Sequence, residues 1–223
     1  MCIRDSLRDH LENMRAITPE QSVHALDLDA LSAHVERLNG TAVAGFLALG
    51  SNGEAPHLAP GEAESVYATV RKAAGPGKLV LAGTGQLSTH ATIEMTRRAA
   101  GVGCDAALVL TPFYYRGSMT HAAFVAHFTA VADASPVPVL IYNVPASTGL
   151  NIAPATVAEL SRHPNVAGMK DSAGDIGQLA ETGRVTRDGK PFAVFCGSSP
   201  ATLPALGLAG HEEVAALPSR AGD

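Results

Sequence analysis

The sequence has no tryptophan, few aromatic residues and no cluster of basic residues. Aromatic residues make up 4% of the 223 residues, whereas hydrophobic residues make up 46%. A core must therefore be built from many small side chains, mainly alanine and valine, packed close together, which suits a sheet covered by helices. The net charge of -5 and the lack of a basic cluster argue against nucleic acid or an anionic membrane as a partner.

Cysteine and long apolar runs are also scarce. Cys2, Cys104 and Cys196 are odd in number and far apart, which fits neither a disulfide framework nor a zinc site and predicts a reducing, cytoplasmic location. No apolar run reaches the roughly 20 residues that span a bilayer. The nine histidines show no spacing typical of metal ligands, so no metal is expected. Residues 1–6 lack the apolar core of a signal peptide and are predicted to be extraneous, leaving 7–223 as one domain.

Lysine is scarce too, and one of the four has an unusual setting. Lys72 lies in a helical pattern, and Lys78 and Lys190 lie in loops rich in glycine and proline. Lys170 ends the apolar stretch 166–169, which predicts a buried strand. An ammonium taken out of water loses hydration, and this favours the neutral, nucleophilic amine that forms Schiff bases with carbonyl substrates. The alternative is that Lys170 ends an edge strand and points into solvent.

Apolar stretches and helical patterns alternate along the whole chain. Strands are predicted at 14–18, 43–49, 79–82, 106–110, 139–142, 166–169, 193–196 and 214–217, and helices at 28–38, 60–74, 89–100, 120–134, 154–162, 176–185 and 201–208. Repeated strand-helix units imply parallel strands with right-handed crossovers, and eight strands favour a (β/α)8 barrel. A doubly wound open sheet would require a glycine-rich dinucleotide fingerprint, which the sequence lacks.

Polar residues gather where these strands end. The loop at 50–54 offers small side chains and backbone donors, tyrosines follow the strands at 106–110 and 139–142, and Lys170 ends a third strand. In a barrel the loops after the strands carry the chemistry. The set therefore predicts a 2-oxo acid site, with the carboxylate held at Ser51 and Asn52 and the keto carbon attacked by Lys170. Alternatively, the tyrosines cap the barrel as amphipathic side chains.

Four motifs carry a resemblance to a known family. They are Gly-Ser-Asn-Gly-Glu at 50–54, Tyr-Tyr-Arg-Gly at 114–117, Tyr-Asn-Val-Pro-Ala-Ser-Thr-Gly at 142–149 and Gly-Met-Lys-Asp-Ser at 168–172. Together they resemble the dihydrodipicolinate synthase and N-acetylneuraminate lyase family, Schiff-base enzymes on (β/α)8 barrels that handle pyruvate. Within this family, the four motifs are most similar to those of 4-hydroxy-2-oxoglutarate aldolases. The resemblance covers residues 16–217.

The resemblance implies a catalytic role for four residues. The Schiff-base lysine of the family falls on Lys170 and its proton-shuttling tyrosine on Tyr142. Ser51 takes the place of a threonine in the proton relay, and Tyr114 that of a tyrosine that reaches into the site of a neighbouring subunit. A homo-oligomer, commonly a dimer of dimers, is therefore implied. The covalent imine between Lys170 and the substrate replaces any cofactor.

The same resemblance implies a lyase that cleaves 4-hydroxy-2-oxoglutarate to pyruvate and glyoxylate. Ser51, Asn52 and Gly53 would bind the substrate carboxylate, and Ser172 would offer a hydroxyl to the bound acid. Ser147 stands where synthases of lysine biosynthesis usually carry an arginine that pairs with a second carboxylate, and this argues against the synthase reaction. The alternatives are another lyase, synthase or dehydratase of the family, or an impaired fragment that acts only as a binding subunit.

The carboxyl-terminal region departs from the family pattern. Members usually continue past the last strand with an eighth helix and further helices, whereas this sequence stops at Asp223. Glu212 and Glu213 replace residues that are usually glycine. The expected fold is therefore a barrel truncated after strand eight, as in a fragment of a longer gene product.

Overall fold

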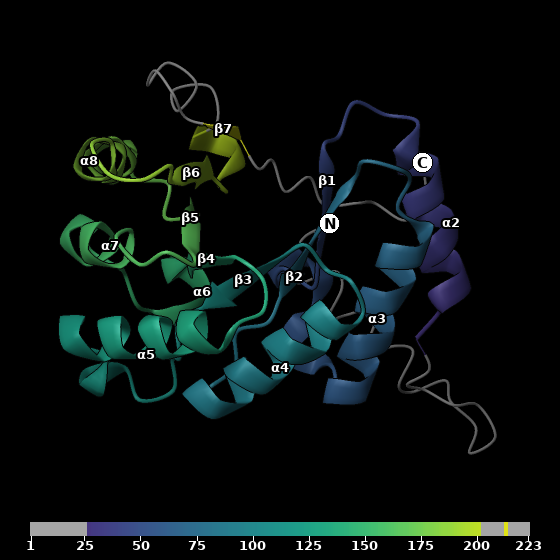
Figure 1. Ribbon diagram of the computed structural model, residues 1–223, viewed down its shortest axis with the longest axis horizontal. Coiled ribbons are helices and arrows are strands. Elements are labelled where there is room, and N and C mark those ends of the chain that lie inside the picture. The colour runs from purple at the N-terminus through teal and green to yellow at the C-terminus, as the bar shows by residue number, and fades with distance from the viewer. Residues whose placement is uncertain (1–25, 202–211, 214–223) are drawn as a thin grey trace.

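A computed structural model describes residues 26–201 and 212–213, which form a curved parallel sheet next to a layer of helices (Figure 1). The strands follow chain order, β1 to β7, and each pairs in parallel with the next. Their bounds are β1 Gly45–Ala48, β2 Leu79–Gly83, β3 Ala106–Leu110, β4 Val139–Asn143, β5 Val166–Asp171, β6 Ala193–Cys196 and β7 Glu212–Glu213. Parallel neighbours in chain order are what repeated strand-helix units produce.

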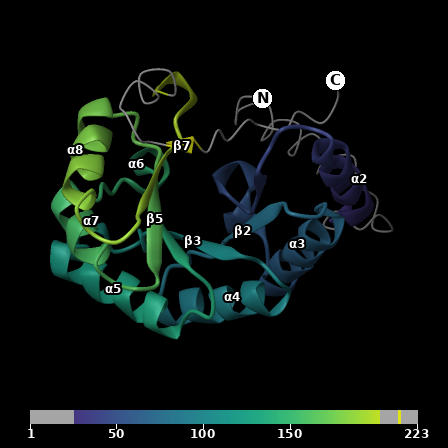
Figure 2. The same ribbon diagram turned by 45° about the horizontal axis from the view of Figure 1, so that its top comes forward.

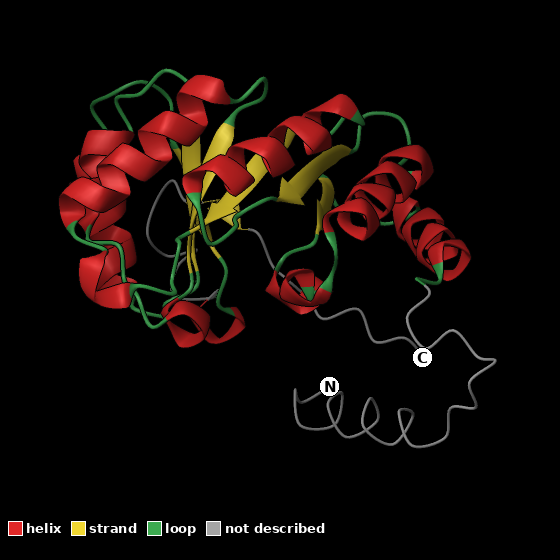
Figure 3. Cartoon of the chain, turned by 90° about the horizontal axis from the view of Figure 1, so that it is seen from below, coloured by secondary structure: helices red, strands yellow, loops and turns green. Residues whose placement is uncertain are grey.

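The helices lie in an arc around one face of this sheet (Figure 2). The α-helices are α2 Leu28–Asn39, α3 Pro60–Ala73, α4 Thr89–Gly101, α5 His121–Ala134, α6 Pro145–Thr148, α7 Pro154–Leu160 and α8 Ile176–Thr186. Seen from below, the strands lie inside the curve of the helical layer (Figure 3). None of the helices in residues 26–201 combines the length and apolar character needed to cross a membrane.

Alternation along the strands divides the core into two layers. In β3, Ala107 and Val109 pack with Phe124 and Phe128 of α5 in the layer between sheet and helices. Leu108 points to the other face, where it packs with Tyr142 inside the curve of the sheet. Successive side chains of a strand point to opposite faces of the sheet. A strand that is buried on both faces therefore carries apolar residues at successive positions. The inner face is where a side chain at a strand end can reach a site.

The predicted elements from 43 to 196 are confirmed, with small shifts at their ends. The short helix α6 was not predicted. The strand predicted at 14–18, most of the helix predicted at 201–208 and the strand predicted at 214–217 lie outside the described residues. The strand β7 at Glu212–Glu213 was not predicted.

The described strands form a curved part of a barrel. Over residues 26–201 and 212–213, β1 and β7 are the outer strands of a seven-stranded sheet and do not pair with each other. The α/β class and the parallel order agree with the sequence-based expectation. Closure of the barrel through a further strand at 14–18 stays a prediction.

Candidate functional site

Lys170 lies inside the curve of the sheet near the end of β5. Its side chain is 3% exposed, and Lys170 pairs in register with Tyr142 of β4. Lys170 Nζ lies 4.8 Å from the centroid of the Tyr142 ring, a distance at which the face of the ring attracts a cation. The alternative in which Lys170 points into solvent is therefore wrong.

The hydroxyl group of Tyr142 connects this strand end to the loop after β1. Tyr142 is 6% exposed, and its hydroxyl forms a hydrogen bond of 3.1 Å with Ser51 Oγ. Because either oxygen can be the donor, the pair can pass a proton in either direction. The structure thus brings Lys170, Tyr142 and Ser51 together from three separate segments.

The loop that carries Ser51 begins in a strained conformation. Leu49, a buried residue that is 7% exposed, has a positive φ of +58°. This left-handed backbone conformation costs a non-glycine residue about 1–2 kcal/mol. A short 3₁₀ turn then spans Ser51–Gly53. The Gly53 N–H donates to Gly50 O at 2.9 Å, so this donor is already in use. The first N–H groups of a helical turn, here those of Ser51 and Asn52, have no partner within the turn.

Gly197, directly after β6, leaves the space that the Lys170 side chain occupies. A Cβ on Gly197 would stand 2.5 Å from Lys170 Cε and even closer to Ser172 Oγ. Ser172 Oγ is buried and has no hydrogen-bond partner among the described residues. A buried hydroxyl without a partner is uncommon, so this group suits a polar ligand. Sequence reasoning missed Gly197, whose only signal was a glycine at a strand end.

A second group of polar residues lies behind Lys170, on the helical side of the sheet. Asn143 and Asp171, 0% and 4% exposed, end β4 and β5 and join through a hydrogen bond of 3.2 Å between Asn143 Nδ2 and Asp171 Oδ1. Asn151 and Gln178 complete the group. Both strand-end residues lie within the motifs quoted above, but the sequence assigned them no role.

The remaining predicted site residues lie at the surface of this single chain. Tyr114 is 69% exposed, and its ring packs edge-on against Tyr115 with centroids 5.0 Å apart. In the described part of the chain, no hydrogen bond joins Tyr114 to the pair formed by Tyr142 and Ser51. Asn52 and Ser147 are also exposed, Ser147 on the short helix α6.

Among the described residues, histidines occur both at the surface and in the core. His121, at the start of α5, bonds to Glu159 Oε2 at 3.0 Å, whereas His127 is 4% exposed and bonds to Thr89 Oγ1 at 2.9 Å. Burial lowers the pKa of His127 to about 4. No group of three or more histidine, cysteine, aspartate or glutamate side chains in the described residues is arranged to hold a metal ion.

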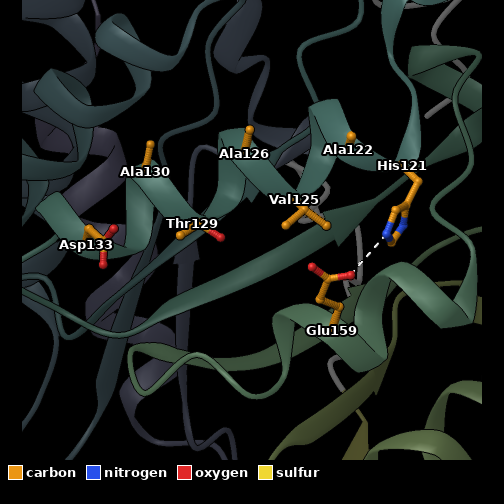
Figure 4. Close-up of a pocket in the computed structure, with 8 residues that line it drawn as sticks. All are labelled: His121, Ala122, Val125, Ala126, Thr129, Ala130, Asp133 and Glu159. Carbon is orange, nitrogen blue, oxygen red and sulfur yellow. Dashed lines mark hydrogen bonds and ion pairs between the residues drawn. The ribbon is translucent and has the colours of Figure 1, made fainter.

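A shallow hollow of about 420 Å³ lies on the outer layer of helices (Figure 4). Its lining comes from α5 and from Glu159 of α7, and the His121–Glu159 contact stands at one end (Figure 4). The α5 residues that face the sheet, Phe124 and Phe128 among them, belong to the core, so the hollow uses the opposite face of α5. It is separate from the Lys170 site.

Comparison with known proteins now adds to this geometry. The chain matches the Dihydrodipicolinate synthetase family over residues 14–220. It belongs to this family. This member of the dihydrodipicolinate synthetase family is 41% identical over 196 residues to a 4-hydroxy-tetrahydrodipicolinate synthase of Methanospirillum hungatei. The aligned region covers 87% of this chain and 66% of the relative. A synthase of the same name from an Exiguobacterium species is 37% identical over 200 residues, covering 90% of this chain and 67% of the relative.

Solved structures of the family have the same fold. Dihydrodipicolinate synthase from Aquifex aeolicus has a TM-score of 0.81 and 32% identity, over 90% of this chain and 67% of its own. The Acinetobacter baumannii enzyme, solved in complex with pyruvate, has a TM-score of 0.80 and 30% identity, over 90% of this chain and 67% of its own. The chain thus spans about two thirds of the length of these relatives.

Proposed function

We propose that this chain carries the site of an enzyme that binds a 2-oxo acid such as pyruvate as a Schiff base on Lys170. The observation that carries the proposal is a lysine 3% exposed whose Nζ lies 4.8 Å from the ring of Tyr142. The family, and a neighbour solved with pyruvate, support the same substrate class. No cofactor is needed, because the imine itself serves as the electron sink.

The carboxylate of the 2-oxo acid would be held by the loop after β1. Since the Gly53 N–H already donates to Gly50 O, the donors for the carboxylate would come from Ser51 and Asn52. The Ser172 hydroxyl, buried and without a partner among the described residues, would donate to the same acid from the side of Lys170. These contacts would place the keto carbon against the amine.

We further propose aldol cleavage of 4-hydroxy-2-oxoglutarate as the reaction. Lys170 Nζ attacks the keto carbon, and water leaves as the imine forms. Tyr142 takes the proton of the C4 hydroxyl while its own proton passes to Ser51 Oγ, and the hydroxyl protons of Ser51 and of Tyr114 of a neighbouring subunit move on in turn to solvent. The C3–C4 bond breaks, its electrons move into the protonated imine to give a neutral enamine, and glyoxylate leaves. Protonation at C3 and hydrolysis then release pyruvate.

The second carboxylate of this substrate needs a cation at the mouth of the site. Ser147 stands where the synthases usually carry an arginine, but another arginine is close by. Arg116 Nη1 lies 2.6 Å from the position that a Cβ on Gly149 would take, two residues beyond Ser147. Gly149 has φ +66° and no side chain, so the guanidinium group can lie directly over the end of α6. We propose Arg116 as the partner of the distal carboxylate.

A second candidate is the synthase reaction named for the relatives. The two relatives with this name are 41% and 37% identical to the chain. Their similarity supports a reaction in which enzyme-bound pyruvate condenses with an amino aldehyde to give 4-hydroxy-tetrahydrodipicolinate. The first half of both reactions, formation of the pyruvate imine on Lys170, is shared. The aldolase and the synthase therefore differ in the groups that bind the second substrate, Ser147 above all.

Steady-state kinetics separate the candidates. The aldolase proposal predicts that kcat/KM for cleavage of 4-hydroxy-2-oxoglutarate exceeds kcat/KM for condensation with the amino aldehyde and for cleavage of sialic acid. The reverse order would replace it with the second candidate or with a sialic acid lyase. If pyruvate forms an adduct while none of these substrates turns over, the chain is a binding subunit.

A further inference from the structure

Four polar side chains form a closed ring of hydrogen bonds on the helical side of the sheet, behind Lys170. Asn143 Nδ2 donates to Asp171 Oδ1 at 3.2 Å and to Asn151 Oδ1 at 2.8 Å. Gln178 Nε2 donates to Asp171 Oδ2 at 2.9 Å and to Asn151 Oδ1 at 3.1 Å. We call this set of Asn143, Asn151, Asp171 and Gln178 the amide ring.

The polar side-chain atoms of the amide ring also form further hydrogen bonds. Asn143 Oδ1 accepts from the Ile152 N–H at 3.1 Å, Asp171 Oδ1 also accepts from the Ala173 N–H at 2.8 Å, and Gln178 Oε1 accepts from Asn151 Nδ2 at 2.7 Å. Asn143 and Asp171 are buried. A buried network of this kind is stabilising only while its members are satisfied, so it favours a single arrangement.

The amide ring lies one peptide unit away from the candidate catalytic residues. Asn143 follows Tyr142 and Asp171 follows Lys170, and both pairs are in register between β4 and β5. The backbone beside the ring is also bonded to the site, since the Ser172 N–H donates to Asn143 O at 2.8 Å and the Gly197 N–H donates to Asp171 O at 2.7 Å. A shift of the ring would therefore move all of the strand ends that surround Lys170.

We infer that the amide ring fixes the position of Lys170 Nζ relative to the Tyr142 hydroxyl, so that Asp171 and Asn143 are positioning residues for imine chemistry. This inference rests on the proposed function. Reacting groups must be held close to their productive geometry, and a displacement of about 1 Å costs on the order of a hundredfold in rate. A ring that served stability alone would change unfolding without changing the rate at which the folded protein forms an imine.

Asp171→Asn tests the inference with little change of shape. The asparagine keeps the acceptor that bonds to Ala173 and Asn143, but it sets an NH₂ group against Gln178 Nε2, a second donor. Gln178→Ala, at a half-buried position, removes the same contact more mildly and serves where Asp171→Asn fails to fold.

Asn165→Asp is the matched control. Asn165 precedes β5 at the end of the strand opposite Lys170, and its Nδ2 donates to Ala132 O at 2.9 Å and to Ser135 O at 3.0 Å. A carboxylate there faces the same carbonyl oxygens without a proton to donate. The variant therefore loses partly buried hydrogen bonds, and with them stability, far from the site.

The measurement is the rate at which pyruvate and borohydride convert each folded variant into the reduced adduct, together with urea unfolding. We expect Asp171→Asn to react about ten- to a hundredfold more slowly than wild type and Gln178→Ala to be slowed by a smaller factor, whereas Asn165→Asp should react at the wild-type rate despite lower stability. The inference is overturned if Asp171→Asn reacts like wild type or if Asn165→Asp slows equally. A wild-type protein that forms no adduct overturns the proposed function as well.

Discussion

Replacement of Gly197 by alanine tests how tightly the structure packs around Lys170. The new Cβ would stand 2.5 Å from Lys170 Cε and 3.1 Å from Lys170 Cγ. Ordinary contact between two carbon atoms requires about 3.5–4.0 Å. The Lys170 side chain must therefore move by roughly 1 Å or the end of β6 must move away.

The substitution is expected to lower both the folding stability and the rate of imine formation. Overpacking of this kind costs about 1–3 kcal/mol of folding free energy. A displacement of roughly 1 Å at the amine is expected to slow imine formation on the order of a hundredfold. Because Gly197 is not among the glycines with positive φ, alanine can adopt its backbone conformation, so strain at the backbone does not complicate the comparison.

The assay is the rate of adduct formation with pyruvate and borohydride, with urea unfolding measured alongside. Gly61→Ala in α3 is the control, since a Cβ there meets no atom within 4 Å and alanine in a helix is about 0.5–1 kcal/mol more favourable than glycine. We expect Gly61→Ala to keep the wild-type rate. If Gly197→Ala also reacted at the wild-type rate, Lys170 could not occupy the place described above.

Three further predictions concern single side chains. Tyr142→Phe removes the hydroxyl but keeps the ring beside Lys170, so kcat for aldol cleavage should fall about a hundredfold or more in steady-state assays; an unchanged kcat would exclude Tyr142 as the base. Arg116→Ala should raise KM for 4-hydroxy-2-oxoglutarate about tenfold through loss of a charged hydrogen bond while leaving the trapping rate with pyruvate unchanged. Burial lowers the pKa of His127 from its ordinary value of about 6.5 to about 4, so between these two pH values the unfolded chain binds a proton that the folded chain does not, and the free energy of unfolding falls as pH falls. Between pH 7 and pH 5, wild type should therefore lose about 2 kcal/mol more than His127→Gln in urea unfolding. Equal losses would contradict this prediction.

The interior lysine was predicted from an apolar strand that ends in a lysine, together with the polar residues at the other strand ends and the resemblance to the family. Lys170 is 3% exposed, and the strand-helix alternation around it is confirmed from 43 to 196. Apolar runs and helical periodicity are local patterns, so they are visible without a fold.

Contacts between distant segments were not visible in this way. The pairing of Asn143 with Asp171 depends on the register of two strands 28 residues apart, and the role of Gly197 depends on how β6 approaches β5. The helix α6 was missed because Pro145–Thr148 is only four residues long, too short for a periodic signal. Tertiary packing, rather than local propensity, fixes these features.

The central claim is that Lys170 forms the covalent bond with the substrate. The most direct test is to reduce the protein with borohydride in the presence of pyruvate, digest it and locate the modified residue by mass spectrometry, with Lys170→Arg as the control. We expect a single modified lysine, Lys170, and no adduct in the variant. Modification at Lys72, Lys78 or Lys190 that persists in Lys170→Arg, or no modification of the folded wild-type protein, would contradict it.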